Sequence, residues 1–142
     1  MAENLEDLVA DFQSFDLNER LNLLLEYSEK LPELPERYQD HPDLLERVEE
    51  CQSPVYLFVE VQDDTAHTVN VFFTAPAEAP TTRGFASILQ TCLDGLPAAE
   101  VLDFQDSLPD KLGLTEAVSP LRIRGMRAML GRIKRNVREK LS

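Results

Sequence analysis

The chain has 142 residues and a formal net charge of −12, with 43% hydrophobic and 28% charged residues, a composition typical of a soluble globular protein of one domain. The negative charge argues against nucleic acid as a partner, and no apolar run approaches the roughly 18 residues that a membrane-spanning helix requires. The two cysteines are too few for a disulfide framework and the acidic N-terminus is unlike a signal peptide, so we expect a cytoplasmic protein with reduced thiols.

The N-terminal part of the chain is expected to form two helices and a connector. Apolar residues at helical spacing predict a first helix over residues 4–15 and a second helix from about residue 17, ending before the proline at position 32. Asp16 followed by Glu19 has the spacing of a capping box for the second helix. Residues 31–42 contain three prolines, which indicates a long connector of extended or turn character.

The middle of the chain is expected to form a hairpin of two strands, over residues 55–61 and 68–74, where β-branched and aromatic side chains alternate. One face should pack on helices, and the partly covered face should carry the aromatic side chains of Tyr56, Phe58 and Phe72. An isolated hairpin is marginal, so a third strand or a helical cover is required. Residues 43–48 fit either a helical turn or a short strand.

The C-terminal half is expected to be helical. A helix capped by Thr81 or Thr82 is predicted to end near residue 93, and two short helices are predicted over residues 98–104 and 109–114.

The last helix is predicted to begin after a Ser119 cap, with Pro120 at its first position, and to run to the C-terminus. Gly125 costs such a helix about 1 kcal/mol relative to alanine, so we expect close packing there. The segment from residue 122 onward carries one acid and eight of the 14 basic residues, a charge of +7. We expect either a solvated helix face or a surface that attracts an acidic partner.

Cys51 is the strongest candidate for a functional residue. It ends a polar segment just before the first predicted strand, because Pro54 favours extended geometry in the residue before it. Its neighbours Glu50, Gln52 and Ser53 are polar, which argues against the usual burial of a free cysteine as a small hydrophobe. Glu50 raises the pKa of the neighbouring thiol, so this cysteine is not self-activated and fits an acceptor that its partner activates.

Four short blocks stand in a characteristic order along the chain: LPELP at 31–35, CQSPVY at 51–56, Gly84 with the apolar run after it, and SPLRIRGM at 119–126. Together they resemble the SufE family, the sulfur-acceptor proteins of iron–sulfur cluster assembly, over residues 17–141. Glu50 stands where that family commonly has glycine, which indicates a divergent branch.

The resemblance implies an α+β fold: a small antiparallel sheet of about three strands, covered by helices from both ends of the chain, as in SufE and the N-terminal domain of NifU. It implies that residues 1–142 form a single domain. It also favours a short strand near residues 46–49.

The function implied by the resemblance centres on Cys51 as the catalytic residue. It would take persulfide sulfur from a cysteine desulfurase, whose cofactor is pyridoxal phosphate, stimulate that enzyme, and deliver the sulfur to iron–sulfur scaffold proteins. Gln52 and Ser53 would position the loop, and Arg122 and Gly125 would contact the partner or steady the loop. No cofactor or metal of its own is expected for this sulfur-transfer protein. Whether Cys51 rests exposed or tucked against the apolar surface stays open.

Other functions also stay open. A rhodanese-type sulfurtransferase could supply the sulfur, or the chain could bind a desulfurase without carrying sulfur. A cysteine hydrolase would pair Cys51 with His41 or His67, but the sequence has no evident oxyanion motif. A zinc or cluster scaffold would use Cys51, Cys92 and the histidines, but their spacing matches no ligand pattern. Cys92 lies on an apolar helical face, where a core position is the expected one.

Overall fold

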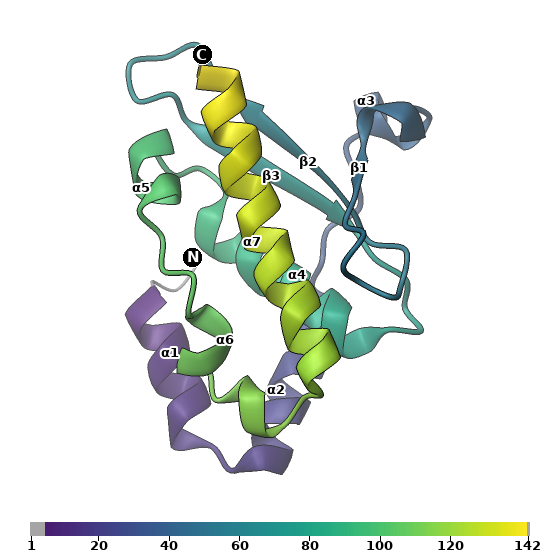
Figure 1. Cartoon of the computed structure of the whole chain (residues 1–142), viewed down its shortest axis with the longest axis vertical. Helices are drawn as coiled ribbons and strands as arrows, with labels where there is room; N and C mark the ends of the chain where they lie inside the picture. Colours follow the sequence, from purple (N-terminus) through teal and green to yellow (C-terminus); the bar gives the residue numbers. More distant parts are fainter. Residues whose placement is uncertain (1–4, 142) are drawn as a thin grey trace.

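A three-stranded antiparallel sheet, with strand order β1-β2-β3, lies against helices from both ends of the chain in the computed structural model (Figure 1). The structure describes residues 5–141. The strands are β1 (Glu46–Arg47), β2 (Tyr56–Val61) and β3 (Val69–Thr74). This arrangement confirms the predicted α+β fold. No helix among residues 5–141 is both long and apolar enough to cross a bilayer.

The two N-terminal helices form close to where the sequence predicts them, as α1 (Leu5–Ser14) and α2 (Leu17–Glu29). The predicted start of the first at residue 4 lies outside the described residues. The capping box of α2 is confirmed, since the Glu19 amide donates to Asp16 Oδ1 (2.8 Å) and the Asp16 amide donates to Glu19 Oε1 (3.1 Å). These reciprocal bonds satisfy two backbone N–H groups that the helix itself leaves without partners.

The prolines predicted a connector of extended or turn character over residues 31–42. The structure shows that this connector also contains the one-turn helix α3 (Glu36–Gln39). The side chain of Tyr38 on this turn is buried. Its ring lies 4.5 Å from that of Phe58 and 5.6 Å from that of Phe72, on the outer face of the sheet. A single turn is too short to show helical periodicity, and its stability comes from this tertiary contact.

Residues 43–48 were predicted to form either a helical turn or a short strand, and the structure contains both. The 3₁₀ turn η1 (Pro42–Leu44) leads into β1, which pairs with β2 through Glu46 opposite Leu57. The resemblance therefore placed the short strand correctly.

The inner face of the sheet forms one side of the hydrophobic core. Its buried side chains alternate along β2 and β3 and include Leu57, Val59, Val69, Val71 and Phe73. Helix α4 (Pro80–Leu93) packs on β3 and helix α7 (Pro120–Leu141) packs on β2, while α2 packs against α4. The alternation predicted from the sequence thus identifies the buried face.

The start of α4 corrects a prediction. The helix begins at Pro80, and its N-cap residue Ala79 makes no side-chain capping bond, so neither Thr81 nor Thr82 is the cap. Proline suits the first helical position because its fixed φ matches the helix and its missing N–H would have had no partner there. Thr82 is instead buried inside the first turn.

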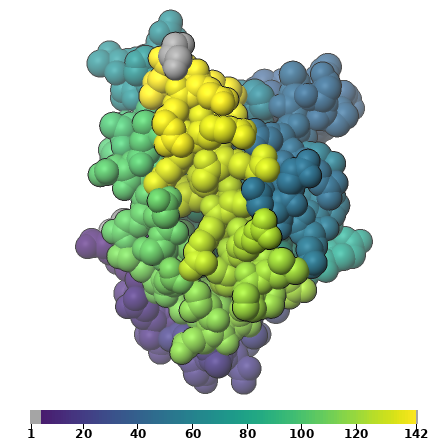
Figure 2. Space-filling model, in the orientation of Figure 1, coloured from purple at the N-terminus to yellow at the C-terminus, as the bar shows by residue number. Residues whose placement is uncertain are grey.

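The rest of the chain wraps back along the core before its last helix. It forms α5 (Ala98–Leu102), α6 (Leu108–Lys111) and η2 (Leu114–Glu116), and then α7, whose predicted Ser119 cap accepts a bond from the Arg122 amide (3.4 Å). Figure 2 shows α7, in yellow, lying between the green segment that contains α5 and α6 and the blue segment that contains β1. Helix α7 therefore borders the segment that carries Cys51.

Candidate functional site

Cys51 lies at the tip of the loop that joins β1 to β2, which we call the Cys51 loop (residues 48–55). The Val48 amide donates to the Val55 carbonyl (2.9 Å), which closes the loop, and the Cys51 amide donates to the Val48 carbonyl (3.1 Å). Pro54 precedes the strand without belonging to it. The predicted position of the cysteine, at a loop tip directly before a strand, is therefore the observed one.

The tip of the Cys51 loop folds back onto α7. Cys51 is only 7% exposed and belongs to the hydrophobic core, so the prediction from its polar neighbours that it is not buried was wrong. A Cβ atom placed on Gly125 would lie 2.8 Å from Cys51 Sγ and 3.5 Å from Cys51 Cα, so a larger residue there would displace the thiol. The close packing expected at Gly125 is thus observed, and the thiol rests tucked against the backbone of α7.

A small cavity of about 50 Å³ adjoins the thiol, and we call it the Cys51 cavity. It is lined by Cys51, Gln52, Ser53, Thr82, Leu121, Arg122 and Gly125. The structure therefore brings together all five residues that the sequence and the resemblance singled out. A cavity of this volume has room for at least one water-sized group.

Two of the lining residues are not evident from the sequence. Thr82 was predicted as a possible helix cap, and that prediction gave no indication that it lines the cavity. Leu121 is 45% exposed and stands one turn before Gly125 on α7. The spacing of four residues that puts two side chains on one helix face is the signal that could have identified Leu121.

The environment of Cys51 favours the neutral thiol. Burial is the largest cause and, with a smaller contribution from the Glu50 carboxylate, raises the pKa of Cys51 to about 11, while Arg132 acts in the opposite direction. The predicted effect of Glu50 thus has the right sign. Since the thiolate is the nucleophile, the thiol of Cys51 is unreactive at neutral pH while the loop is in this position.

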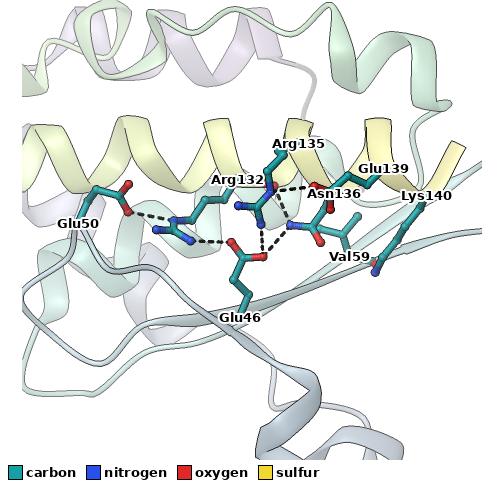
Figure 3. A network of polar contacts seen from close by, with 8 residues as sticks. All are labelled: Glu46, Glu50, Val59, Arg132, Arg135, Asn136, Glu139 and Lys140. Atoms are coloured by element: carbon teal, nitrogen blue, oxygen red, sulfur yellow. Dashed lines mark hydrogen bonds and ion pairs between the residues drawn. The ribbon is translucent and has the colours of Figure 1, made fainter. Parts of the chain in front are cut away.

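An ion-pair network holds the Cys51 loop to α7 (Figure 3). Arg132 Nε donates to Glu50 Oε1 (2.9 Å), and Arg132 Nη1 donates to Glu46 Oε2 (2.7 Å). Glu46 also accepts from Asn136 Nδ2 (3.0 Å) and from Arg135. The bond from Arg132 is the main cause that lowers the pKa of Glu50. Burial acts to raise the pKa of Glu46, but the hydrogen bonds from Asn136, Arg132 and Arg135 outweigh it and lower this pKa as well, so both carboxylates are held in their charged form.

Arg132 is a residue that the sequence did not single out from the other basic residues of the last helix. It stands seven residues after Gly125, which puts both on the same face of α7. That spacing is the signal that could have pointed to it, but the partner carboxylates lie far away in the sequence.

Much of the positive charge of α7 is neutralised within the molecule, so the helix is not simply a solvated face. Besides the network above, Arg127 pairs with Asp110 (2.8 Å) and Lys134 pairs with Asp106 (3.0 Å). Arg122 and Arg124 are exposed near the start of the helix, and Arg122 lines the Cys51 cavity.

The other cysteine and the histidines lie apart from this cavity. Cys92 is half-buried against the hydrophobic core, and burial raises its pKa to about 11. His41 and His67 are exposed and neither lines the Cys51 cavity, and His67 lies in the loop at the far end of β2. Within residues 5–141 no group of three or more His, Cys, Asp or Glu side chains is placed to hold a metal ion.

Comparison with known proteins gives one consistent result. The family model SufE, described as an Fe-S metabolism associated domain, matches residues 6–137. An uncharacterized SufE-like protein of Mycobacterium tuberculosis is 48% identical over 135 residues, which cover 95% of this chain and 92% of the relative.

Two further matches extend this result. SufE-like protein 1, chloroplastic/mitochondrial, of Arabidopsis thaliana is 28% identical over 127 residues, which cover 89% of this chain but only 32% of that protein. The solution structure of a hypothetical protein from Thermus thermophilus superposes with a TM-score of 0.81 at 35% identity, over 96% of this chain and 95% of that one.

Proposed function

The chain belongs to the SufE family of Fe-S metabolism associated domains, and from this premise we propose that Cys51 accepts persulfide sulfur from a cysteine desulfurase and carries it toward iron–sulfur cluster assembly. The observation that carries the proposal is the tip of the Cys51 loop. It holds a single thiol, tucked against Gly125 and beside a cavity with room for a small group. This arrangement suits a thiol that is shielded at rest and delivered by movement of its loop.

The transfer step is a thiol exchange with no net oxidation. The Cys51 thiolate attacks the outer sulfur of a persulfide on the donor cysteine. A bond forms between that sulfur and Cys51 Sγ, the sulfur–sulfur bond of the donor breaks, and the donor cysteine leaves as a thiolate. Removing the sulfur frees the donor for its next turnover, which accounts for stimulation of the desulfurase.

The buried thiol makes loop movement a requirement of the step. In the retracted position the thiol is 7% exposed and its pKa is about 11, so it is neither reachable nor ionised. Moving the Cys51 loop into the donor site removes the effect of burial and lowers the pKa toward its ordinary value. Gln52 and Ser53 flank the thiol and move with it, so they set how it is presented.

Arg122 is the proposed contact for the donor protein. It is exposed at the rim of the Cys51 cavity, near the start of α7, where a partner that receives the loop would lie. Gly125 acts on the retracted state, since it leaves the space that the thiol occupies. After transfer, a scaffold that assembles iron–sulfur clusters is the proposed recipient of the sulfur.

The test is transfer of sulfur to a defined thiol. The protein is incubated with a cysteine desulfurase from the same organism and with cysteine, and then analysed by intact-protein and peptide mass spectrometry. We expect a mass gain of one sulfur atom on Cys51, absent in Cys51→Ser and retained in the matched control Cys92→Ser. Sulfide release by the desulfurase should rise with the wild-type protein and not with Cys51→Ser.

Three outcomes would contradict the proposal. A sulfur gain that survives Cys51→Ser would place the acceptor elsewhere. Stimulation of the desulfurase by Cys51→Ser, without any sulfur gain, would indicate a binding module that carries no sulfur. A gain that occurs only with a rhodanese-type sulfurtransferase and thiosulfate would assign a different donor.

A further inference from the structure

Arg132 on α7 binds both β1, through Glu46, and the Cys51 loop, through Glu50 (Figure 3). Its Nε binds the carboxylate beside Cys51, on Glu50, and its Nη1 binds the carboxylate on β1, on Glu46. We propose that Arg132 is a positioning residue for Cys51: this clamp, formed by Glu46, Glu50 and Arg132, holds the thiol in its retracted place, and its Glu50 contact must break when the loop moves out. The inference rests on the proposed function for its use in sulfur transfer.

The Glu46 half of the clamp is a fixed anchor. Glu46 belongs to β1 and lies opposite Leu57 of β2 in the sheet. Its carboxylate accepts hydrogen bonds from Arg132, Arg135 and Asn136, and Asn136 Nδ2 also donates to the Arg132 carbonyl (2.8 Å). Because several donors hold this one carboxylate, the guanidinium of Arg132 keeps its place whether or not Glu50 is bound.

The Glu50 half is the contact that can open. Among the described side chains, Arg132 Nε is the one hydrogen-bond donor to the Glu50 carboxylate, and Arg124 adds a weaker electrostatic attraction. The loop tip has few other directional contacts. Its main-chain bonds include the Cys51 amide to the Val48 carbonyl and the Val55 amide to the Ser53 carbonyl, both within the loop. The packing of Cys51 on Gly125 is a van der Waals contact without a hydrogen bond.

The contact is strong enough to matter because it is partly desolvated. The side chain of Arg132 is 19% exposed and that of Glu50 is 31% exposed. Charge-assisted hydrogen bonds of this kind are stronger than neutral ones, while fully exposed ion pairs add little. Losing the contact should therefore increase the open population of the loop, with the rest of the fold unchanged.

The experiment measures how fast Cys51 of the free, reduced, full-length protein reacts with iodoacetamide. Peptide mass spectrometry reads Cys51 separately from Cys92. We expect Glu50→Gln and Arg132→Gln each to accelerate alkylation of Cys51 by roughly three- to tenfold, the range expected for a partly buried charged contact.

The alkylation rates of the two variants distinguish loss of the clamp from a direct effect of charge on the pKa of the thiol. Glu50 raises the pKa of Cys51 and Arg132 lowers it. Charge alone would therefore make Glu50→Gln faster and Arg132→Gln slower, whereas loss of the clamp makes both faster. The double variant should react no faster than the faster single variant, because the contact between Arg132 and Glu50 is already lost in each single variant.

The matched control is Asp110→Asn, which breaks the pair between Asp110 and Arg127 on the same helix and does not touch the Cys51 loop. It should leave the alkylation rate at the wild-type value. The proposal is overturned if Arg132→Gln reacts at or below the wild-type rate, or if the double variant shows the product of the two single effects.

A second measurement keeps the test decisive if Arg132→Gln does not fold. Added salt weakens ion pairs, so the alkylation rate of the wild type should rise with sodium chloride while that of Glu50→Gln should not. Equal salt dependence in the two proteins would overturn the clamp. Because no desulfurase is present, these results do not depend on whether Cys51 accepts sulfur, and the two proposals can fail separately.

Discussion

At the scale of single residues, the reactivity of Cys51 is set mainly by burial. Its Sγ lies against Gly125, and removal from water raises its pKa to about 11. At pH 7 the thiol in the retracted loop is therefore almost entirely protonated, and a smaller fraction of it is ionised than in a free cysteine. Under the proposed function, such a resting state would limit side reactions of the thiol with electrophiles before sulfur is transferred.

This raised pKa predicts how Cys51 affects stability at alkaline pH. Because the folded-state pKa lies above the unfolded value near 9, folding favours the protonated thiol, and this contribution is complete below pH 9 and is lost as the pH rises through 11. Between pH 8 and 10.5 the wild type should lose roughly 1–2 kcal/mol more unfolding free energy than Cys51→Ala.

Urea denaturation of both reduced proteins at the two pH values provides the measurement. Cys92, the tyrosines and the lysines titrate in both proteins, so the difference isolates Cys51. Identical pH dependence in wild type and variant would mean that the thiol is not shielded in solution.

At the scale of elements, one glycine sets the distance between α2 and α4. A Cβ on Gly84 would lie 2.2 Å from the Leu24 carbonyl oxygen and 3.0 Å from Leu24 Cδ1. The obstacle is backbone, which cannot rotate away as a side chain can. Since α4 also packs on β3 and supplies Thr82 to the Cys51 cavity, the approach of these two helices supports the site.

Gly84→Ala should therefore destabilise the protein by roughly 2–3 kcal/mol, because the two helices must separate to admit the methyl group. The matched control is Gly131→Ala on α7, where nothing lies within 4 Å of the added Cβ. That change should stabilise the protein by up to about 1 kcal/mol through helix propensity. Denaturant unfolding measures both, and a neutral Gly84→Ala would show that the helices adjust freely.

At the scale of the whole molecule, charge is unevenly distributed and partly cancelled within the fold. The net charge is −12, although the segment from residue 122 onward carries +7. Several of its basic residues pair with acids brought in from the sheet and the α5–α6 segment, such as Glu46 and Asp110. Arg122 and Arg124 are exposed near the Cys51 cavity, and the exposed Leu121 lies beside them. This end of α7 is where we expect the donor protein to dock.

Reversing these charges should weaken docking. Arg122→Glu and Arg124→Glu should each reduce desulfurase stimulation at subsaturating protein by roughly three- to tenfold at low salt, and the difference should shrink in high salt. Arg127→Gln, which removes a cation already paired with Asp110, is the control and should have little effect. Sulfide release measured against protein concentration provides the readout. Equal effects of all three variants would exclude a localised docking surface.

Features that depend on a few neighbouring residues could be predicted from the sequence. The helical and strand periodicities, the capping box of Asp16 and Glu19, and the Ser119 cap all involve contacts within a few positions. For the same reason Pro54 was enough to place Cys51 just before β2, and the charge of Glu50 was enough to give the sign of its effect on the thiol.

The assembly of the site could not be predicted from the sequence, because it depends on long-range contacts. The tuck of Cys51 against Gly125, the turn of Thr82 into the cavity, and the clamp from Arg132 to Glu46 and Glu50 join residues that lie far apart in the chain. Burial and ion pairing depend on which surfaces meet when helices and strands pack. Local sequence rules do not contain that information, and so the largest influence on the thiol, its removal from water, became visible only in the folded molecule.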